Sequence, residues 1–268
     1  SPALFSSTVS RASLSISLKD HRHRFDGEPL DRGTFFSKWR GRYGARLRGC
    51  PVRLIRGVVG QTLAEMDTRH YVVDTTDGPS FDATYTIVAK DILKLADDDR
   101  AQAPSLSNGS LAGSINNSTT SATLSPTGIG DLEYPASGWV CIGGKEVCAF
   151  TRSGDALTID RAEFGTVAAA HDAGDRVQLV LRYTGNTPAF IIEDLLTNYA
   201  GISSSYIDLP EWETECADHL GVIYACTITE PTSVNKLVAA LIEQAALAVW
   251  WDDRAMQVRL ANVGVYAP

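Results

Sequence analysis

The sequence lacks the features by which membrane, metal and secreted proteins are most easily recognised. No run of ~18 apolar residues occurs in its 268 residues, so no segment is expected to span a bilayer. Its five cysteines are an odd number at irregular spacing, with neither a Cys-x-x-Cys pair nor a Cys/His zinc pattern. The chain opens Ser-Pro-Ala-Leu-Phe, without an initiator methionine, a basic n-region or an apolar h-region. We therefore expect no export signal, and we interpret the sequence as the interior of a longer protein.

Motifs for common enzymatic chemistry are also missing. The Gly-x-Gly-x-x-Gly and Walker patterns, the Gly-x-Ser-x-Gly elbow and His-Glu-x-x-His are absent. Paired carboxylates that cleave glycosidic bonds have no fixed spacing in a sequence, so a cell-wall hydrolase stays open as the less favoured alternative. Its candidates are Asp155, Asp160, Glu163, His171 and Asp172, and each also has a plainer interpretation as a turn residue. We predict no catalytic residue, no cofactor and no metal.

The charges are unevenly distributed along the chain. Overall, 24 basic residues stand against 32 acidic ones, and the net charge of −8 disfavours a general nucleic-acid binder. The range 32–64 nevertheless holds eight basic residues and no acidic one, interleaved with Phe35, Phe36, Trp39 and Tyr43. Basic and aromatic residues together are typical of nucleic-acid surfaces. The alternative, which we favour, is a set of strands whose solvent-facing arginines contact an acidic neighbouring subunit or form a plain solvated face. The candidate contact residues are Lys38, Arg40, Arg42, Arg46 and Arg48.

The first hundred residues predict a mostly β domain. Ser13 to Leu18 alternates apolar and polar residues and predicts a half-buried strand. PVRLIRGVVG and RHYVVDTTDG predict two more strands, and ATYTIVAKDILKLADD predicts a strand that leads into a short helix. Residues 1–104 are therefore predicted to form a β-rich domain closed by a helix.

Residues 105–125 are rich in Ser, Asn, Thr and Gly, which is a linker composition, although ATLSP is also compatible with the start of a strand. Residues 126–181 then predict a small β module. Gly143-Gly144 between WVCI and EVCAFT indicates a hairpin, and ALTID and RVQLVL predict further strands.

The hairpin leaves two pairings open. A four-residue loop would place Cys141 opposite Cys148, within reach of a disulfide, whereas a two-residue loop would place Cys141 opposite Glu146. Buried, reduced thiols are the interpretation we favour. Three aromatic residues of the module, Trp139, Phe150 and Phe164, either fill its core or line a face that recognises a sugar or a protein.

The C-terminal residues 182–268 predict an α+β domain. Thr187-Pro188 is typical of a helix start, and Gly201 of a helix end. Asp208 to Glu211 resembles a capping box, and MQVRLAN pairs with AVWWD as a hairpin around residues 252–255. The predicted fold class is α+β, mainly β, with a small β-barrel-like module inserted between two larger domains.

Three stretches also carry a resemblance to a known family: GWVCIGGKEVCAFTRSGDALTIDRAEFGTVAAAHDAGD, the upstream stretch that runs from TRHYVVDTTDG to TYTIVAKDILKLADDDRAQAP, and LRYTGNTPAFIIEDLLTNYAGI after it. The chain resembles the baseplate hub, or tail-tip, proteins of long-tailed bacteriophages and prophages, from about residue 13 to about residue 263. The two cysteines and the Gly-Gly-Lys turn of the hairpin depart from what is typical of that family.

The resemblance implies a structural subunit of the virion, made in the bacterial cytoplasm. Copies of the chain would form a closed ring, most often a trimer, around the tail channel, together with other tail proteins. Two hub domains would form the ring wall, the small module would decorate it, and DNA would be present only in transit. Binding of a host-surface glycan or receptor by the module is the alternative function.

Overall fold

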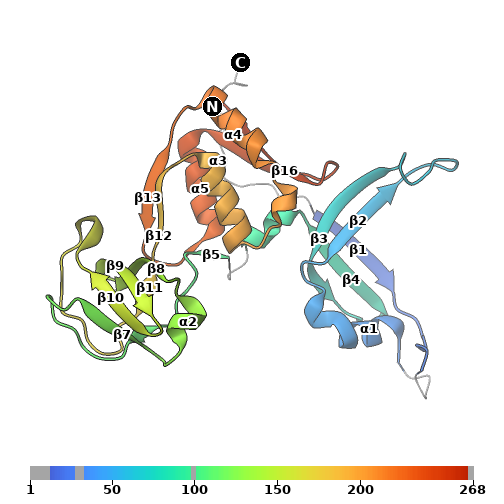
Figure 1. Cartoon of the computed structure of the whole chain (residues 1–268). Coiled ribbons are helices and arrows are strands. Elements are labelled where there is room, and N and C mark those ends of the chain that lie inside the picture. The colour runs from blue at the N-terminus through green and yellow to red at the C-terminus, as the bar shows by residue number, and fades with distance from the viewer. Residues whose placement is uncertain (1–12, 28–32, 98–100, 265–268) are drawn as a thin grey trace, which may run out of the picture. The chain divides into compact units, whose positions relative to one another are not determined.

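The computed structural model describes residues 13–27, 33–97 and 101–264, and it is mainly β, with 38% strand and 26% helix (Figure 1). The predicted fold class is therefore confirmed. The chain divides into two compact units that are interleaved in sequence. The first unit comprises the described residues of Ser1–Leu95, Ile202–Trp212 and Ala246–Pro268, and the second comprises those of Ala96–Gly201 and Glu213–Ala245.

The first unit contains an antiparallel four-stranded sheet that forms a half-barrel, with the strand order β1-β4-β3-β2. Its strands are β1 (Ser13–Lys19), β2 (Pro51–Arg56), β3 (Asp67–Asp77) and β4 (Thr84–Lys90). The alternation in β1 places Leu14, Ile16 and Leu18 on the half-buried face, as predicted. The short helix predicted after β4 is the 3₁₀ helix η2 (Ile92–Asp97). Residues 1–12 of the predicted domain lie outside the described residues.

A helix replaces part of the predicted arginine-bearing strands. Residues Phe35–Tyr43 form α1, followed by the 3₁₀ turn η1 (Gly44–Arg46). The helix packs its aromatic side against β4, where the Phe36 ring stacks on Tyr85 with centroids 4.9 Å apart, and Trp39 meets the same ring edge-on at 5.9 Å. Phe35, Phe36 and Trp39 have the spacing of one helical face, and this aromatic period outweighs the strand interpretation.

The C-terminal hairpin belongs to the first unit, not to a separate final domain as predicted. It consists of β15 (Leu247–Asp252) and β16 (Gln257–Asn262). Trp251 Nε1 donates to the carbonyl of His70 at 3.0 Å, and Arg69 Nη1 lies 3.2 Å from Asp253 Oδ2. These contacts fasten the hairpin to β3. They join residues far apart in the chain, so local patterns contained no sign of them.

The second unit contains a six-stranded, nearly closed barrel, coloured green to yellow in Figure 1. The sheet order is β11-β8-β9-β10-β7-β6. The strands are β6 (Ser110–Leu111), β7 (Ser121–Ser125), β8 (Ser137–Ile142), β9 (Glu146–Ser153), β10 (Ala156–Asp160) and β11 (Val177–Leu179). Three backbone hydrogen bonds connect the segments of the first and last strands: Leu111 N donates to Asp175 O at 2.9 Å, Gly174 N to Leu111 O at 2.8 Å, and Val177 N to Gly109 O at 2.9 Å. The predicted barrel-like module is confirmed.

The predicted linker is wrong, because residues 105–125 supply two strands of the barrel. Leu111, Ala122 and Leu124 are buried in the barrel core, and only the alternate positions of β7 face solvent. The Ser and Thr residues at those exposed positions give the segment its linker-like composition. The four remaining strands of the barrel, β8 to β11, and the helix α2 (Ile129–Glu133) also contribute side chains to the core. These are Ile129, Val140, Ile142, Cys148, Phe150, Leu157, Ile159 and Val177.

The remainder of the second unit is formed by short strand pairs and helices. β12 (Leu181–Asn186) pairs with β13 (Tyr224–Ile228), and β5 (Gln102–Ala103) pairs with β14 (Thr232–Ser233). The helices are α3 (Pro188–Asp194), continued by the π turn η4 (Leu195–Tyr199), then the part of α4 (Leu209–His219) from Glu213 onward, and α5 (Val234–Ala245). The predicted start of α3 is confirmed, since Thr187 accepts the Phe190 N–H and Pro188 is the first helical residue.

The β8–β9 hairpin has a three-residue loop, so both predicted registers are wrong. Cys141 lies opposite Val147, and Cys148 lies opposite Val140. Side chains at successive positions of a strand point to opposite faces, so Cys141 and Cys148 point away from each other. Cys141, Cys148 and Cys216 are buried free thiols, as the favoured interpretation expected, whereas the free thiols of Cys50 and Cys226 are half-buried and exposed.

This register predicts the order of thiol alkylation. Cys226 is exposed, whereas Cys148 is fully buried and its burial, with the nearby negative charge of Glu146, raises its pKa to about 12. In the native protein Cys226 should react first, and Cys148 only after unfolding, which peptide mass spectrometry measures. Recovery of a disulfide-linked Cys141–Cys148 peptide from folded protein would contradict the register.

Candidate functional site

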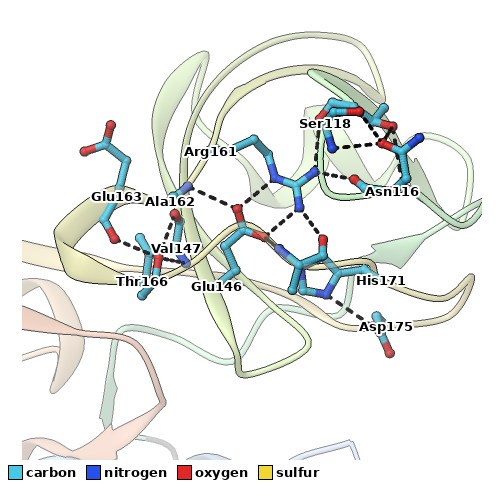
Figure 2. Close-up of polar contacts among 12 residues, drawn as sticks. Asn116, Ser118, Glu146, Val147, Arg161, Ala162, Glu163, Thr166, His171 and Asp175 are labelled. Atoms are coloured by element: carbon cyan, nitrogen blue, oxygen red, sulfur yellow. Dashed lines mark hydrogen bonds and ion pairs between the residues drawn. The ribbon is translucent and has the colours of Figure 1, made fainter.

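A buried carboxylate lies at the centre of the densest polar network in the described barrel (Figure 2). Glu146 is the first residue of β9 and is fully buried. Arg161 grips it with two parallel hydrogen bonds, Nε to Oε1 at 2.8 Å and Nη2 to Oε2 at 2.6 Å. This fork geometry is the strongest form of ion pair available to an arginine.

Three further donors complete the coordination of the carboxylate. The backbone N–H of Ala162 donates to Oε1 at 3.1 Å, and that of Ala169 donates to Oε2 at 3.0 Å. His171 Nε2 lies 3.0 Å from Oε2. An ionised carboxylate can only accept, so Nε2 carries the hydrogen in this contact. The start and the middle of the loop between β10 and β11 are therefore fixed to one side chain.

Arg161 extends the network to another loop. Its Nη1 donates to the carbonyls of Asn116 at 2.8 Å and Thr119 at 3.0 Å, and its Nη2 also reaches the carbonyl of Ala169 (Figure 2). The loop between β6 and β7 is thus connected through one guanidinium to the loop after β10. The network joins three segments of the barrel that are separate in the sequence.

The electrostatics of Glu146 follow from these contacts. Burial on its own would raise the pKa of the carboxyl group. The hydrogen bonds from Arg161, the Ala169 N–H, His171 and the Ala162 N–H outweigh burial and hold the pKa of Glu146 well below its usual range. Glu146 is therefore an ionised acceptor, not a proton donor, and its surroundings are closed to solvent. Chemically, the arrangement can hold loops in place, but it offers no open position to a substrate.

The residues proposed for a hydrolase do not converge. Asp155 accepts the backbone N–H groups of Gly128 at 2.6 Å and Gly130 at 2.8 Å, which lower its pKa and fix the start of α2. His171 is buried against Glu146, whereas Asp160 and Asp172 are exposed. Within residues 13–27, 33–97 and 101–264, no group of three or more His, Cys, Asp and Glu side chains could hold a metal ion.

The three aromatic residues of the predicted recognition face do not lie on one surface of the barrel. Phe150 is a core residue, so its assignment to a surface is wrong. Trp139 and Phe164 do lie together, with ring centroids 5.8 Å apart. The Arg182 guanidinium lies over the Phe164 ring, 3.8 Å from its centroid, and 5.4 Å from that of Trp139. One ring face is thus already covered by a cation, which favours packing over stacking with a ligand.

The predicted subunit-contact residues lie on α1 and just after it. Arg40, Arg42, Arg46 and Arg48 are exposed, whereas Lys38 is half-buried and donates to the carbonyl of His23. Arg40 also donates to the carbonyl of Gly78, and the Arg42 guanidinium lies 4.7 Å from the Phe25 ring centroid. The basic side chains therefore lie around the aromatic residues of α1, and four of them are exposed to solvent.

Sequence reasoning missed the network around Glu146, although one signal was available. Glu146, Cys148 and Phe150 alternate along β9, so the pattern that placed Cys148 and Phe150 inside also placed a glutamate inside. A charge at an inward position requires a partner of opposite charge. Nothing in the local sequence identified Arg161 as that partner.

Comparison of the chain with protein-family models, curated proteins and solved structures found no match. Among the described helices, none is long and apolar enough to cross a membrane. The function is therefore inferred from the residues of this chain and their contacts.

Replacing Glu146 by Gln should destabilise the barrel strongly. Arg161 would keep its buried position without a counter-charge, and breaking one side of a buried ion pair costs about 3–5 kcal/mol. Urea unfolding read from hydrogen exchange of the β8–β9 amides measures this loss. Asp160→Asn, on the exposed end of β10, is the matched control and should change stability little. Equal stability of the two variants would show that the network is dispensable.

The same carboxylate predicts a pH dependence. The pKa of Glu146 is lowered in the folded state from an ordinary value of 4.5, so its contribution is complete above that value and declines as the pH falls below it. Urea midpoints at about pH 7 and about pH 3, followed by near-UV circular dichroism, should fall more for the wild type than for Glu146→Gln. Equal slopes for both proteins would contradict the assignment.

Proposed function

We propose that the chain is part of a structural subunit of a bacteriophage tail tip, a baseplate hub protein that assembles around the tail channel and breaks no bonds. The resemblance of three stretches of its sequence to tail-tip proteins supports the proposal. The mainly β architecture with an inserted barrel agrees with what that resemblance implies.

The observation that carries the proposal is the open sheet of the first unit. In the described part of the chain, β1 pairs with β4 alone and β2 pairs with β3 alone, so each has one edge without a partner strand. Unpaired strand edges offer rows of N–H and C=O groups to other chains, and proteins that do not assemble usually protect them. Exposed arginines lie close by in sequence, on α1 and after it. Extended sheet and charged surface are what a subunit needs to contact its neighbours.

In this role the chain works by contact alone. Copies of it would form a ring, most often a trimer, that adapts the symmetry of the tail tube to that of the tip. A net charge of −8 suits a channel through which DNA passes without binding. The Glu146 network has a structural explanation, since it fixes the loops of the barrel, so the proposal requires no active site there.

Recognition of a host glycan or receptor by the barrel is a second candidate, favoured by one observation. Phe164 has a φ of 52° and is exposed, although a bulky residue rarely adopts that conformation. Replacing Trp139 or Phe164 by Ala should abolish saturable glycan binding if this function is present. Unchanged binding, or none in the wild type, would remove it.

The test of the main proposal is to locate the parent protein in phage particles. Electron microscopy with a label on this chain should place it at the distal end of the tail tube. Peptidoglycan should show no turnover with the purified chain. Particles that lack the protein, or muralytic activity abolished by one carboxylate substitution, would contradict the proposal.

A further inference from the structure

The end of the β2–β3 hairpin carries apolar side chains in open solvent. We call residues Ile55–Met66 the apolar arm. Val59 is fully exposed, Val58 is 69% exposed and Leu63 is 71% exposed. Single exposed apolar residues are common on protein surfaces, but a group of them on one short segment marks an interaction site.

The apolar arm is held in shape by its own polar contacts. Gln61 Oε1 accepts the Val58 N–H at 2.9 Å, and Glu65 Oε2 accepts the Thr62 N–H at 2.8 Å. At the base, Gly57 packs so closely on Met66 that a Cβ there would lie 2.3 Å from the Met66 Cγ. An ordered loop that turns its valines outward is pre-organised for docking, because little conformational entropy remains to be lost.

The charge around the apolar arm selects an acidic partner. Arg53 and Arg56 are exposed on β2 at its base, within the range 32–64 that contains eight basic and no acidic residues. The rest of the chain therefore has 16 basic residues against 32 acidic ones. The one carboxylate of the apolar arm itself, Glu65, is engaged by the N–H and the hydroxyl of Thr62. Asp67, opposite Arg56 in the sheet, is paired with Arg69 and Arg254. Basic segments of two copies would repel each other in a two-fold contact. The basic segment of one copy on an acidic surface of another copy is attractive.

One surface of the second unit has the complementary composition. We call the residues from Asp218 to Ile223, at and after the end of α4, the acidic-apolar surface. Asp218, Val222 and Ile223 are exposed, and Ile223 is 68% exposed. They precede β13, whose residues 225–227 are also exposed. An exposed carboxylate beside two exposed apolar side chains mirrors the arrangement of Arg56 beside Val58 and Val59.

We propose that the apolar arm of one copy docks on the acidic-apolar surface of a second copy of this chain. The inference rests on the proposed function in that it names the contact between subunits. Because the two surfaces differ, the contact is heterologous, and repeated contacts of this kind generate a ring when the rotation closes. Val58, Val59 and Leu63 supply the buried apolar area, and Arg56 with Asp218 sets the register.

The apolar part is tested with the variant Val59→Asp/Leu63→Asp in the full chain. Sedimentation of the wild type over increasing concentration should show self-association, and the variant should associate at least ~10-fold more weakly, since burying a single large apolar side chain contributes at least that much. Both positions are exposed, so circular dichroism should be unchanged. Phe81→Asp is the matched control, because Phe81 is fully exposed in the β3–β4 turn of the same sheet and should leave association intact.

The pairing of the two surfaces is tested by exchanging charges. Arg56→Glu and Asp218→Arg should each weaken association, and the double variant should recover most of the loss. If the losses of association affinity in the two single variants instead add up in the double variant, Arg56 and Asp218 do not contact each other. A wild-type chain that stays monomeric up to about 1 mM, or an apolar-arm variant that associates as well as the wild type, would overturn the inference.

These outcomes are separable from those of the proposed function. A parent protein found at the tail tip whose association survives the apolar-arm variant would remain a hub subunit with a different contact. A parent protein that is absent from particles, yet associates through the apolar arm, would retain the contact and lose the phage role.

Discussion

The barrel depends on one buried ion pair, between Glu146 and Arg161. Taking both charges out of water is costly, and the cost is offset because each carboxylate oxygen accepts several hydrogen bonds and the guanidinium reaches three further carbonyls. The pair therefore joins the start of β9 to the loops after β6 and β10. Those loops are rich in small and polar residues, and their hydrogen bonds to this ion pair add to the packing of Ile115 in the barrel core.

Local patterns in the sequence predicted the elements well. Alternation gave β1, the Gly143-Gly144 turn gave the β8–β9 hairpin, and Thr187-Pro188 gave the start of α3. The predictions that failed were those for features that depend on residues distant in the sequence, and those that were based on composition alone. The Ser- and Thr-rich segment around β7 lies in the barrel, because only its alternate residues are exposed. Arg161 as partner of Glu146, and His70 as acceptor from Trp251, are set by tertiary structure and have no local signal.

The two units, each taken by itself, suit different tasks. The barrel keeps the side chains of Glu146, Cys148 and His171 away from solvent. The first unit instead presents, among its described residues, two strand edges without a partner strand, exposed arginines and an ordered apolar arm. The cost of exposing such groups to water is recovered only when another surface covers them. Such exposures are what the proposed assembly role would require.

Hydrogen exchange of the backbone amides of Ala162 and Ala169 is the most direct test of this account. If the charge of Glu146 fixes the loop, both amides should exchange as slowly as those in the middle of β8 and β9, and Glu146→Gln should release them before the strands open. Fast exchange at Ala162 and Ala169 in the wild type, with β8 and β9 protected, would contradict the central claim, because the loop would then move independently of the buried carboxylate.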